Sequence, residues 1–165
     1  MSGRIFVGGV GNPWLGDLDF GPRWVRRYAD VGWPEHVVVA DAAVAAHRVL
    51  HMLQEVSPDR VIFVAAFPRG DLPGTIRRYR PEDLRLDPDD VQARLGEAAG
   101  GVIDLEHTLA VTRYYGALPE DTVVIEVEAV HRTFGTTFSP EVESSFELVL
   151  EMVRREISRP LEAHA

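Results

Sequence analysis

Apolar runs of strand length alternate along this chain with segments in which apolar residues recur at helical spacing. That alternation is typical of a parallel sheet covered by helices on both faces. We expect strands over residues 4–8, 36–40, 60–66 and 122–129, and helices over 20–28 and 44–55. The pattern therefore predicts an α/β fold: a single three-layer domain whose twisted, mostly parallel sheet is flanked by helices.

The middle of the chain is less regular. The sequence Leu72-Pro73-Gly74-Thr75 predicts a turn that leads into a short edge strand over 76–79. A helix is expected from about residue 87 to 98, because Asp87 and Pro88 suit a helix start. Another helix is expected over 105–115.

The C-terminal helix has the clearest start signal. Ser139 suits the capping position and Pro140 the first helical position, and the apolar periodicity continues to about residue 157. With 165 residues, 45% hydrophobic and 26% charged, the chain has the length and composition of one globular domain. We place this domain at residues 1–159 and a flexible C-terminal tail at 160–165.

Composition narrows the classes of function. A net charge of -9 argues against nucleic acid or an anionic membrane as the main partner. The absence of cysteine excludes disulfides and thiolate metal sites, and the absence of lysine excludes Schiff-base chemistry. No apolar run has the length of a membrane span and no secretion signal is visible, so the expected location is the cytoplasm.

A glycine-rich loop follows the first expected strand. Gly11 and Gly16 have the spacing of a phosphate-binding loop, but Asp17 follows them where that loop needs a lysine. Trp14 occupies the place of the third glycine of a dinucleotide-binding motif. A loop that carries Asp17 and Asp19 is better suited to a cation, or to activating water, than to an anion.

Ligands of open parallel sheets bind at the carboxyl ends of the strands, which selects the candidate residues. Asp17 and Asp19 follow the first strand, Asp41 follows the second, and His107 lies on a helix that leads to the last strand. Together they would suit a divalent metal such as nickel or zinc. The alternative is that the aspartates cap helices and that His107 is an ordinary first-turn residue.

Two further histidines, His47 and His51, lie one helical turn apart, a spacing that can chelate metal. The acid that follows the first histidine in metalloprotease helices is missing here, which argues against such a site.

Several motifs in this order resemble the hydrogenase maturation endopeptidases, which are nickel-dependent processing proteases. The matching segments span nearly the whole chain: Arg4-Ile5-Phe6-Val7-Gly8, Gly11-Asn12-Pro13, Gly16-Asp17, Phe20-Gly21-Pro22-Arg23, Pro73-Gly74-Thr75, His107, Leu118-Pro119 and Phe138-Ser139-Pro140-Glu141-Val142. The first and the last of these are the most specific.

The resemblance implies a twisted sheet between helices and an activity on the hydrogenase large subunit precursor. Such proteases remove a short C-terminal extension after nickel has been inserted, so the nickel is carried by the precursor. The resemblance also implies three metal ligands: an acid in the first loop, an aspartate after the third strand and a histidine in a later helix.

This chain departs from that ligand set at two positions. His107 matches the histidine, whereas Leu18 and Ala65 occupy the two acidic positions. Asp19 is the candidate replacement for the first acid through a shift of one residue, and Asp41 is a further candidate from the neighbouring strand. The catalytic residues and the oligomeric state are left unassigned.

Three functions remain open at this point. The first is a divergent but active maturation protease that engages the nickel of its precursor through Asp17 or Asp19 and His107. The second is a non-catalytic relative that binds a hydrogenase subunit or another maturation factor as a chaperone-like module. The third is a small-molecule hydrolase that uses the same crevice.

Overall fold

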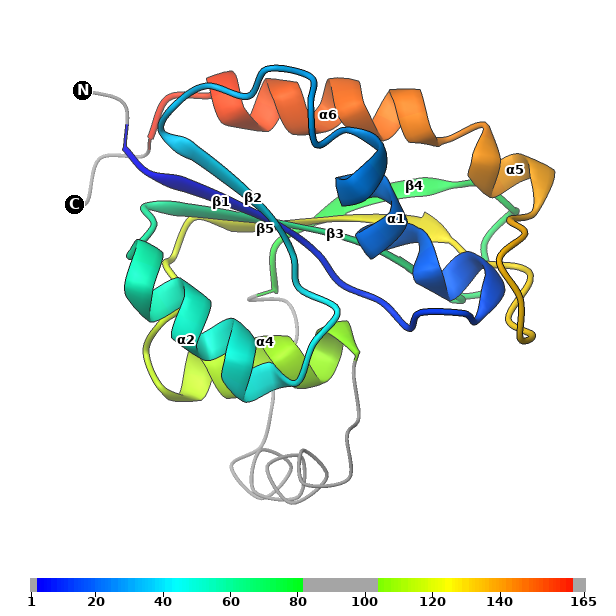
Figure 1. Ribbon diagram of the computed structural model, residues 1–165, viewed down its shortest axis with the longest axis horizontal. Helices are drawn as coiled ribbons and strands as arrows, with labels where there is room; N and C mark the ends of the chain where they lie inside the picture. Colours follow the sequence, from blue (N-terminus) through cyan, green and yellow to red (C-terminus); the bar gives the residue numbers. More distant parts are fainter. Residues whose placement is uncertain (1–2, 82–103, 162–165) are drawn as a thin grey trace.

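The computed structural model describes residues 3–81 and 104–161 of the chain. Within these ranges a five-stranded sheet has the strand order β2-β1-β3-β5-β4 (Figure 1). The strands are β1 (Ile5–Gly9), β2 (Val37–Asp41), β3 (Arg60–Phe67), β4 (Ile76–Tyr79) and β5 (Thr122–Glu128). All neighbouring pairs are parallel except β4 with β5, which is antiparallel. The mixed, mostly parallel sheet predicted from the sequence is confirmed.

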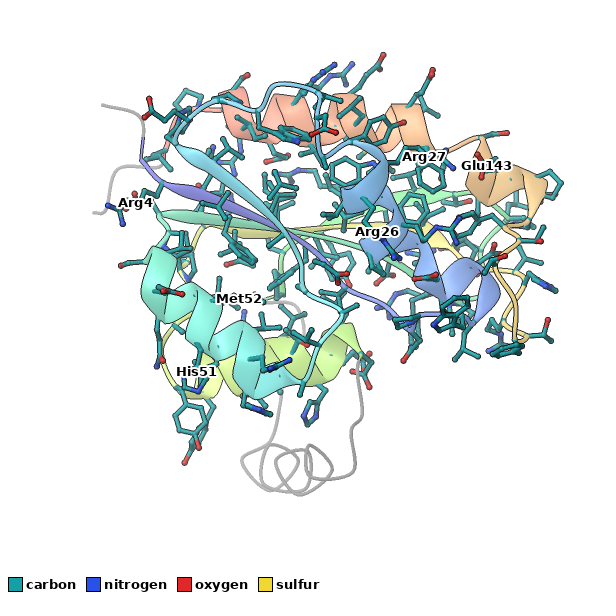
Figure 2. All side chains as sticks on the ribbon, viewed as in Figure 1. Arg4, Arg26, Arg27, His51, Met52 and Glu143 are labelled. Atoms are coloured by element: carbon teal, nitrogen blue, oxygen red, sulfur yellow. The ribbon has the colours of Figure 1, made fainter. Side chains whose placement is uncertain are left out.

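Helices cover both faces of this sheet and complete the three layers (Figure 1). The helices are α1 (Phe20–Arg27), α2 (Ala46–Val56), α4 (Leu105–Tyr114), α5 (Pro140–Glu143) and α6 (Phe146–Ser158). On one side of the sheet lie α1, α5 and α6, and on the other lie α2 and α4. An ion pair of 2.9 Å between Arg27 and Glu143 joins α1 to α5 (Figure 2).

The central strand β3 shows why these residues form a sheet. Every residue of β3 except Phe67 is buried, as expected for a parallel strand covered on both faces. Its side chains alternate between two apolar cores: Ile62 and Val64 belong to the core beneath α1 and α6, whereas Val61 and Phe63 belong to the core beneath α2 and α4. The strand therefore joins both hydrophobic layers.

The C-terminal helix is interrupted, contrary to the prediction of one helix. Its first turn ends at Glu143 and the next helix begins at Phe146. Ser144 donates its hydroxyl to the Pro140 carbonyl and Ser145 donates to the Val142 carbonyl. Serine hydroxyls that bond to nearby backbone in this way compete with regular helix geometry, which explains the break.

Ser139 occupies the predicted N-cap position before Pro140, but its side chain does not cap the helix. The Ser139 hydroxyl makes no capping bond and instead donates to the Asp17 carboxylate at 2.9 Å. The other predicted elements shift by one or two residues at their ends, and the edge strand over 76–79 is found as predicted. The helix predicted over 87–98 lies outside the described residues. None of the helices in the described ranges is long and apolar enough to cross a membrane.

Buried carboxylates attach the edge strand β4 to β5. Glu126 is fully buried and accepts hydrogen bonds from Arg69, from Arg77 and, at 2.9 Å, from the Tyr79 hydroxyl. Glu128 accepts bonds from Arg77 at 2.7 Å and from the backbone amides of the turn that precedes β4. This network fixes the segment that follows β3.

Three acids that pair with arginines make stability depend on pH. Burial by itself would raise the pKa of Glu128, but hydrogen bonds from the Arg69 and Gly70 backbone and from Arg77 hold that pKa below its usual value. Arginine partners likewise lower the pKa of Asp121 and of Glu156 against the effect of burial. At low pH the unfolded chain therefore binds more protons than the folded protein.

We expect the free energy of unfolding to fall as the pH drops below about 4, the usual pKa of these acids in the unfolded chain. The fall continues until the pH reaches the lower pKa values of the folded state, because there the acids are protonated and their bonds to arginine are lost. Each such group contributes up to about 1.4 kcal/mol per pH unit. Urea denaturation across this range checks the slope, and Glu128→Gln should make it shallower. The exposed Glu147→Gln is the control. Parallel curves for both variants and the wild type would contradict the prediction.

Candidate functional site

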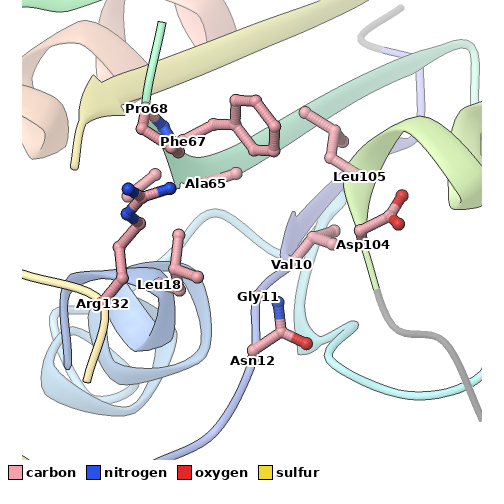
Figure 3. A pocket seen from close by; sticks show the side chains of 11 residues that line it. Val10, Gly11, Asn12, Leu18, Ala65, Phe67, Pro68, Asp104, Leu105 and Arg132 are labelled. Atoms are coloured by element: carbon pink, nitrogen blue, oxygen red, sulfur yellow. The ribbon is translucent and has the colours of Figure 1, made fainter. Parts of the chain in front are cut away.

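A pocket of about 140 Å³ lies at the carboxyl ends of β1 and β3 (Figure 3). It is lined by Val10, Gly11, Asn12, Leu18, Ala65, Ala66, Phe67, Pro68, Asp104, Leu105 and Arg132. These residues come from the loop after β1, the end of β3, the start of α4 and the loop after β5. The pocket thus lies where ligands of open α/β sheets bind.

The loop after β1 reaches the pocket because α1 packs directly on the sheet. A Cβ atom at Gly21 would lie 2.3 Å from the Val10 carbonyl oxygen and 2.4 Å from that of Val64, so only glycine fits there. The Asn12 backbone amide donates to the Leu18 carbonyl at 2.9 Å and closes the loop. The Leu18 side chain is thereby held in the pocket wall.

Asp17 is a structural residue in this arrangement. Its side chain is fully buried and accepts four hydrogen bonds of 2.8–2.9 Å: from the Val130, His131 and Ser139 amides and from the Ser139 hydroxyl. Both oxygens are therefore engaged by the loop that follows β5. Asp17 is not among the pocket residues, and it makes no capping bond to the helix.

Asp19 does not line the pocket and lies close to two cationic side chains. It is 4% exposed, and its oxygens lie 3.7 Å from Arg23 and 3.8 Å from Arg26. Burial raises the pKa of Asp19, although a bond to the Trp14 backbone and the two arginines act in the opposite direction. Its Oδ1 makes no hydrogen bond within the described residues, so the arginines hold this carboxylate through long ion pairs alone.

Neither Asp41 nor His107 is among the residues that line the pocket with Leu18 and Ala65. Asp41 is exposed and accepts a bond of 2.9 Å from the Ala43 amide, so it fixes a turn before α2 rather than capping the helix. His107 is fully buried in the first turn of α4, and neither of its ring nitrogens has a hydrogen-bond partner within the described residues. It is not among the residues that line the pocket.

The other histidines do not complete the site. His47 and His51 are exposed on α2, away from the residues that line the pocket. In the described part of the chain, no group of three or more histidine, aspartate or glutamate side chains is arranged to hold a metal ion.

The structure also brings in polar residues that the sequence did not single out. Asn12, Asp104 and Arg132 line the pocket together with its apolar walls. Asp104 caps α4 by accepting a bond of 2.6 Å from the His107 amide. The strand-end rule that selected Asp17 applies equally to Arg132, which lies in the loop after β5, and would have found it.

The profile of the hydrogenase maturation protease family (HycI) matches residues 23–156 of the chain. The chain belongs to the hydrogenase maturation proteases. The match begins within α1 and ends within α6, and it includes the strands β2 to β5 and the helix α4. It therefore covers most of the elements that position the pocket. No curated protein matches the chain.

Solved structures of maturation proteases have the same fold. A hydrogenase 2 maturation peptidase from Thaumarchaeota archaeon SCGC_AB-539-E09 is 25% identical, with a TM-score of 0.66 over 96% of this chain and 99% of that one. An endopeptidase from Escherichia coli is also 25% identical, with a TM-score of 0.73 over 93% and 91% of the two chains. A [NiFe] hydrogenase maturation protease from Thermococcus kodakarensis KOD1, 18% identical over 94% and 93% of the chains, shares the fold with a TM-score of 0.71.

The pocket of this maturation protease does not fit a nickel ion in its present form. Leu18 and Ala65, which occupy the two acidic positions of the family resemblance, both line it and offer no donor atom. Of the candidate replacements, Asp17 has both oxygens hydrogen-bonded within the scaffold, whereas Asp19 is ion-paired with Arg23 and Arg26 and is not among the residues that line the pocket. The Arg132 guanidinium adds a positive charge to the pocket.

Restoring the two carboxylates should create a metal site. We expect the double variant Leu18→Glu, Ala65→Asp to bind Ni²⁺ at least about tenfold more tightly than the wild type, since both positions share one pocket and carboxylate oxygens can ligate divalent ions. Isothermal titration calorimetry measures the difference. The control is the double variant Leu148→Glu, Ala29→Asp at exposed positions. Equal affinity of the two double variants would contradict the prediction.

Proposed function

We propose that this protein is an active maturation protease that removes the C-terminal extension of a nickel-containing hydrogenase large subunit precursor. The observation that carries the proposal is the place of the pocket. It is built from the loop after β1, the end of β3 and the start of α4. The resemblance draws its site from the same three parts of the fold, and the family match supports the same activity.

Hydrolysis of a peptide bond needs a group that takes a proton from the attacking water and returns one to the departing amine. Asp104 carries the one carboxylate among the described residues that line the pocket. Its bond to the His107 amide fixes the side chain at the start of α4. We assign Asp104 this role: the water oxygen bonds to the carbonyl carbon, the carbon–nitrogen bond breaks, and the proton passes through Asp104 to the amine.

The variant Asp104→Asn separates catalysis from structure, because asparagine caps a helix as well as aspartate does but does not accept the proton. The wild type should shorten the nickel-loaded precursor, as measured by intact mass spectrometry. Asp104→Asn should slow this cleavage at least about 100-fold and leave the thermal unfolding midpoint unchanged. Asp30→Asn, at an exposed position, is the matched control and should cleave at the wild-type rate.

Two results would overturn these assignments separately. If the wild type binds its genuine precursor and leaves the precursor's mass unchanged, the protein is a binding module and the protease proposal is wrong. If the wild type cleaves and Asp104→Asn cleaves equally fast, the protease proposal stands and the role of Asp104 is wrong.

A further inference from the structure

The pocket contains a cationic side chain that the proposed hydrolysis does not use. Arg132 extends from the loop after β5 and lies across the pocket from Asp104 (Figure 3). Neither an ion pair nor a hydrogen bond to the Arg132 guanidinium is found among the described residues. A guanidinium presents several N–H donors in a planar fork that matches a carboxylate.

The second polar group at the pocket is the carboxamide of Asn12, which is partly exposed. Within the described part of the chain its side chain makes no hydrogen bond to protein. The walls between these two polar groups are apolar and include Leu18, Ala65 and Phe67. The pocket therefore offers hydrogen-bond donors next to an apolar wall, which suits a ligand with one polar group on an apolar chain.

One oxygen of the Asp104 carboxylate is stabilised by the start of α4. Its Oδ1 accepts the His107 amide at 2.6 Å, at the N-terminus of α4, where exposed N–H groups and the helix dipole favour an anion. Arg132 has no such partner among the described residues. Among the described residues that line the pocket, Arg132 carries the one positive charge.

The loop that carries Arg132 is held in place from two sides. Asp17 accepts the amides of Val130 and His131, immediately before Arg132. After Arg132, the Gly135 amide donates to the Trp14 carbonyl at 2.7 Å and the Gly16 amide donates to the Gly135 carbonyl at 3.1 Å. The backbone around Arg132 is thus fixed before a ligand arrives, which lowers the entropy lost on binding.

We infer that this pocket recognises a carboxylate on a short peptide segment through Arg132 and Asn12. The inference rests on the proposed function in taking that segment to belong to the precursor. The pocket volume of about 140 Å³ suits one side chain or one terminal residue. The carboxylate receives the N–H groups of Arg132 and the amide N–H of Asn12, and its stem lies against Leu18 and Ala65.

The binding test uses two small probes that differ in charge. N-acetylglycine carries a carboxylate, and N-acetylglycinamide carries a neutral amide of nearly the same shape. Titration of each into the isotopically labelled protein is followed by the backbone amide signals of Gly11, Ala65 and Phe67. We expect saturable shifts with N-acetylglycine, of about millimolar affinity, and affinity for N-acetylglycinamide at least about tenfold weaker.

Variants then locate the binding group. Arg132→Gln should weaken N-acetylglycine at least about tenfold, and Arg132→Lys should retain part of the affinity because it keeps the charge but loses the fork. Arg154→Gln removes the same charge at an exposed position on α6 and should bind like the wild type. Equal binding of the two probes, no binding of either, or unchanged affinity in Arg132→Gln would overturn the inference.

A second measurement connects the pocket to the precursor. With cleavage as the readout, Arg132→Gln should raise KM at least about tenfold and leave kcat within about twofold, because the lost contact binds substrate and transition state alike. An unchanged KM would show that the carboxylate is not on the precursor. If the wild type fails to cleave, the proposed function is wrong, while binding of N-acetylglycine still decides the chemistry of the pocket.

Discussion

Replacing Asp17 with asparagine should destabilise the folded protein by about 3 kcal/mol, one of the largest effects expected of a single side chain here. The carboxylate accepts three backbone amides and one hydroxyl, all at 2.8–2.9 Å, in a fully buried position. Asparagine has nearly the same shape but offers one acceptor oxygen and two N–H donors. At least one buried amide would lose its partner, and a donor would face another donor.

Urea denaturation measures this loss, with Asp41→Asn as the control. Asp41 is exposed and accepts one backbone amide, so its replacement should change the free energy of unfolding by less than about 1 kcal/mol. A destabilisation of similarly small size in Asp17→Asn would contradict the structural role. Because Asp17 holds the loop that carries Arg132, the variant should also weaken N-acetylglycine binding.

The second large effect is expected at the amino-terminal end of the central strand β3, where Arg60→Leu should cost about 3–5 kcal/mol of stability. Arg60 is fully buried at the start of β3 and pairs with Asp121 at 2.7 Å. Its guanidinium also donates to the carbonyls of Glu156, Arg159 and Pro160 at 2.7–2.9 Å. Leucine would leave the Asp121 carboxylate and these carbonyls without that partner at the end of α6.

The matched control is Arg154→Leu, which removes an exposed arginine of α6 and should change stability by less than about 1 kcal/mol. The stability of Arg60→Lys should lie between those of the two leucine variants. An ammonium keeps the charge, but it lacks the planar guanidinium that donates to all of these acceptors at once. Thermal and urea unfolding measure the series. Equal stabilities of Arg60→Leu and Arg154→Leu would show that the buried pair contributes nothing.

The pocket of this chain differs in chemistry from the ligand set that the family resemblance implies. The fold is that of a maturation protease, but the pocket wall is apolar at Leu18 and Ala65 and carries Arg132. The acid that matches the family motif in the first loop, Asp17, serves the scaffold. The nickel and N-acetylglycine titrations test separately whether this pocket takes a metal ion or a carboxylate.

Much of the frame follows from local sequence patterns. The apolar runs predicted β1, β2, β3 and β5 within about two residues, and the Pro73-Gly74-Thr75 turn predicted the edge strand β4. Such patterns are predictive because a strand that is buried on both faces consists of consecutive apolar residues. The break before Phe146 was missed because serine side chains that bond to nearby carbonyls leave the apolar periodicity unchanged.

The site was less predictable because its contacts are long-range. The sequence alone determined the α/β class, the acid-bearing loop after β1, and the apolar residues at positions 18 and 65. Only the tertiary structure decided that Asp17 bonds to residues 113–122 positions away and that Asn12, Asp104 and Arg132 meet in one pocket. The physical reason is that hydrophobic periodicity is a property of neighbouring residues, whereas the partner of a buried carboxylate is set by how separate loops pack at the sheet edge.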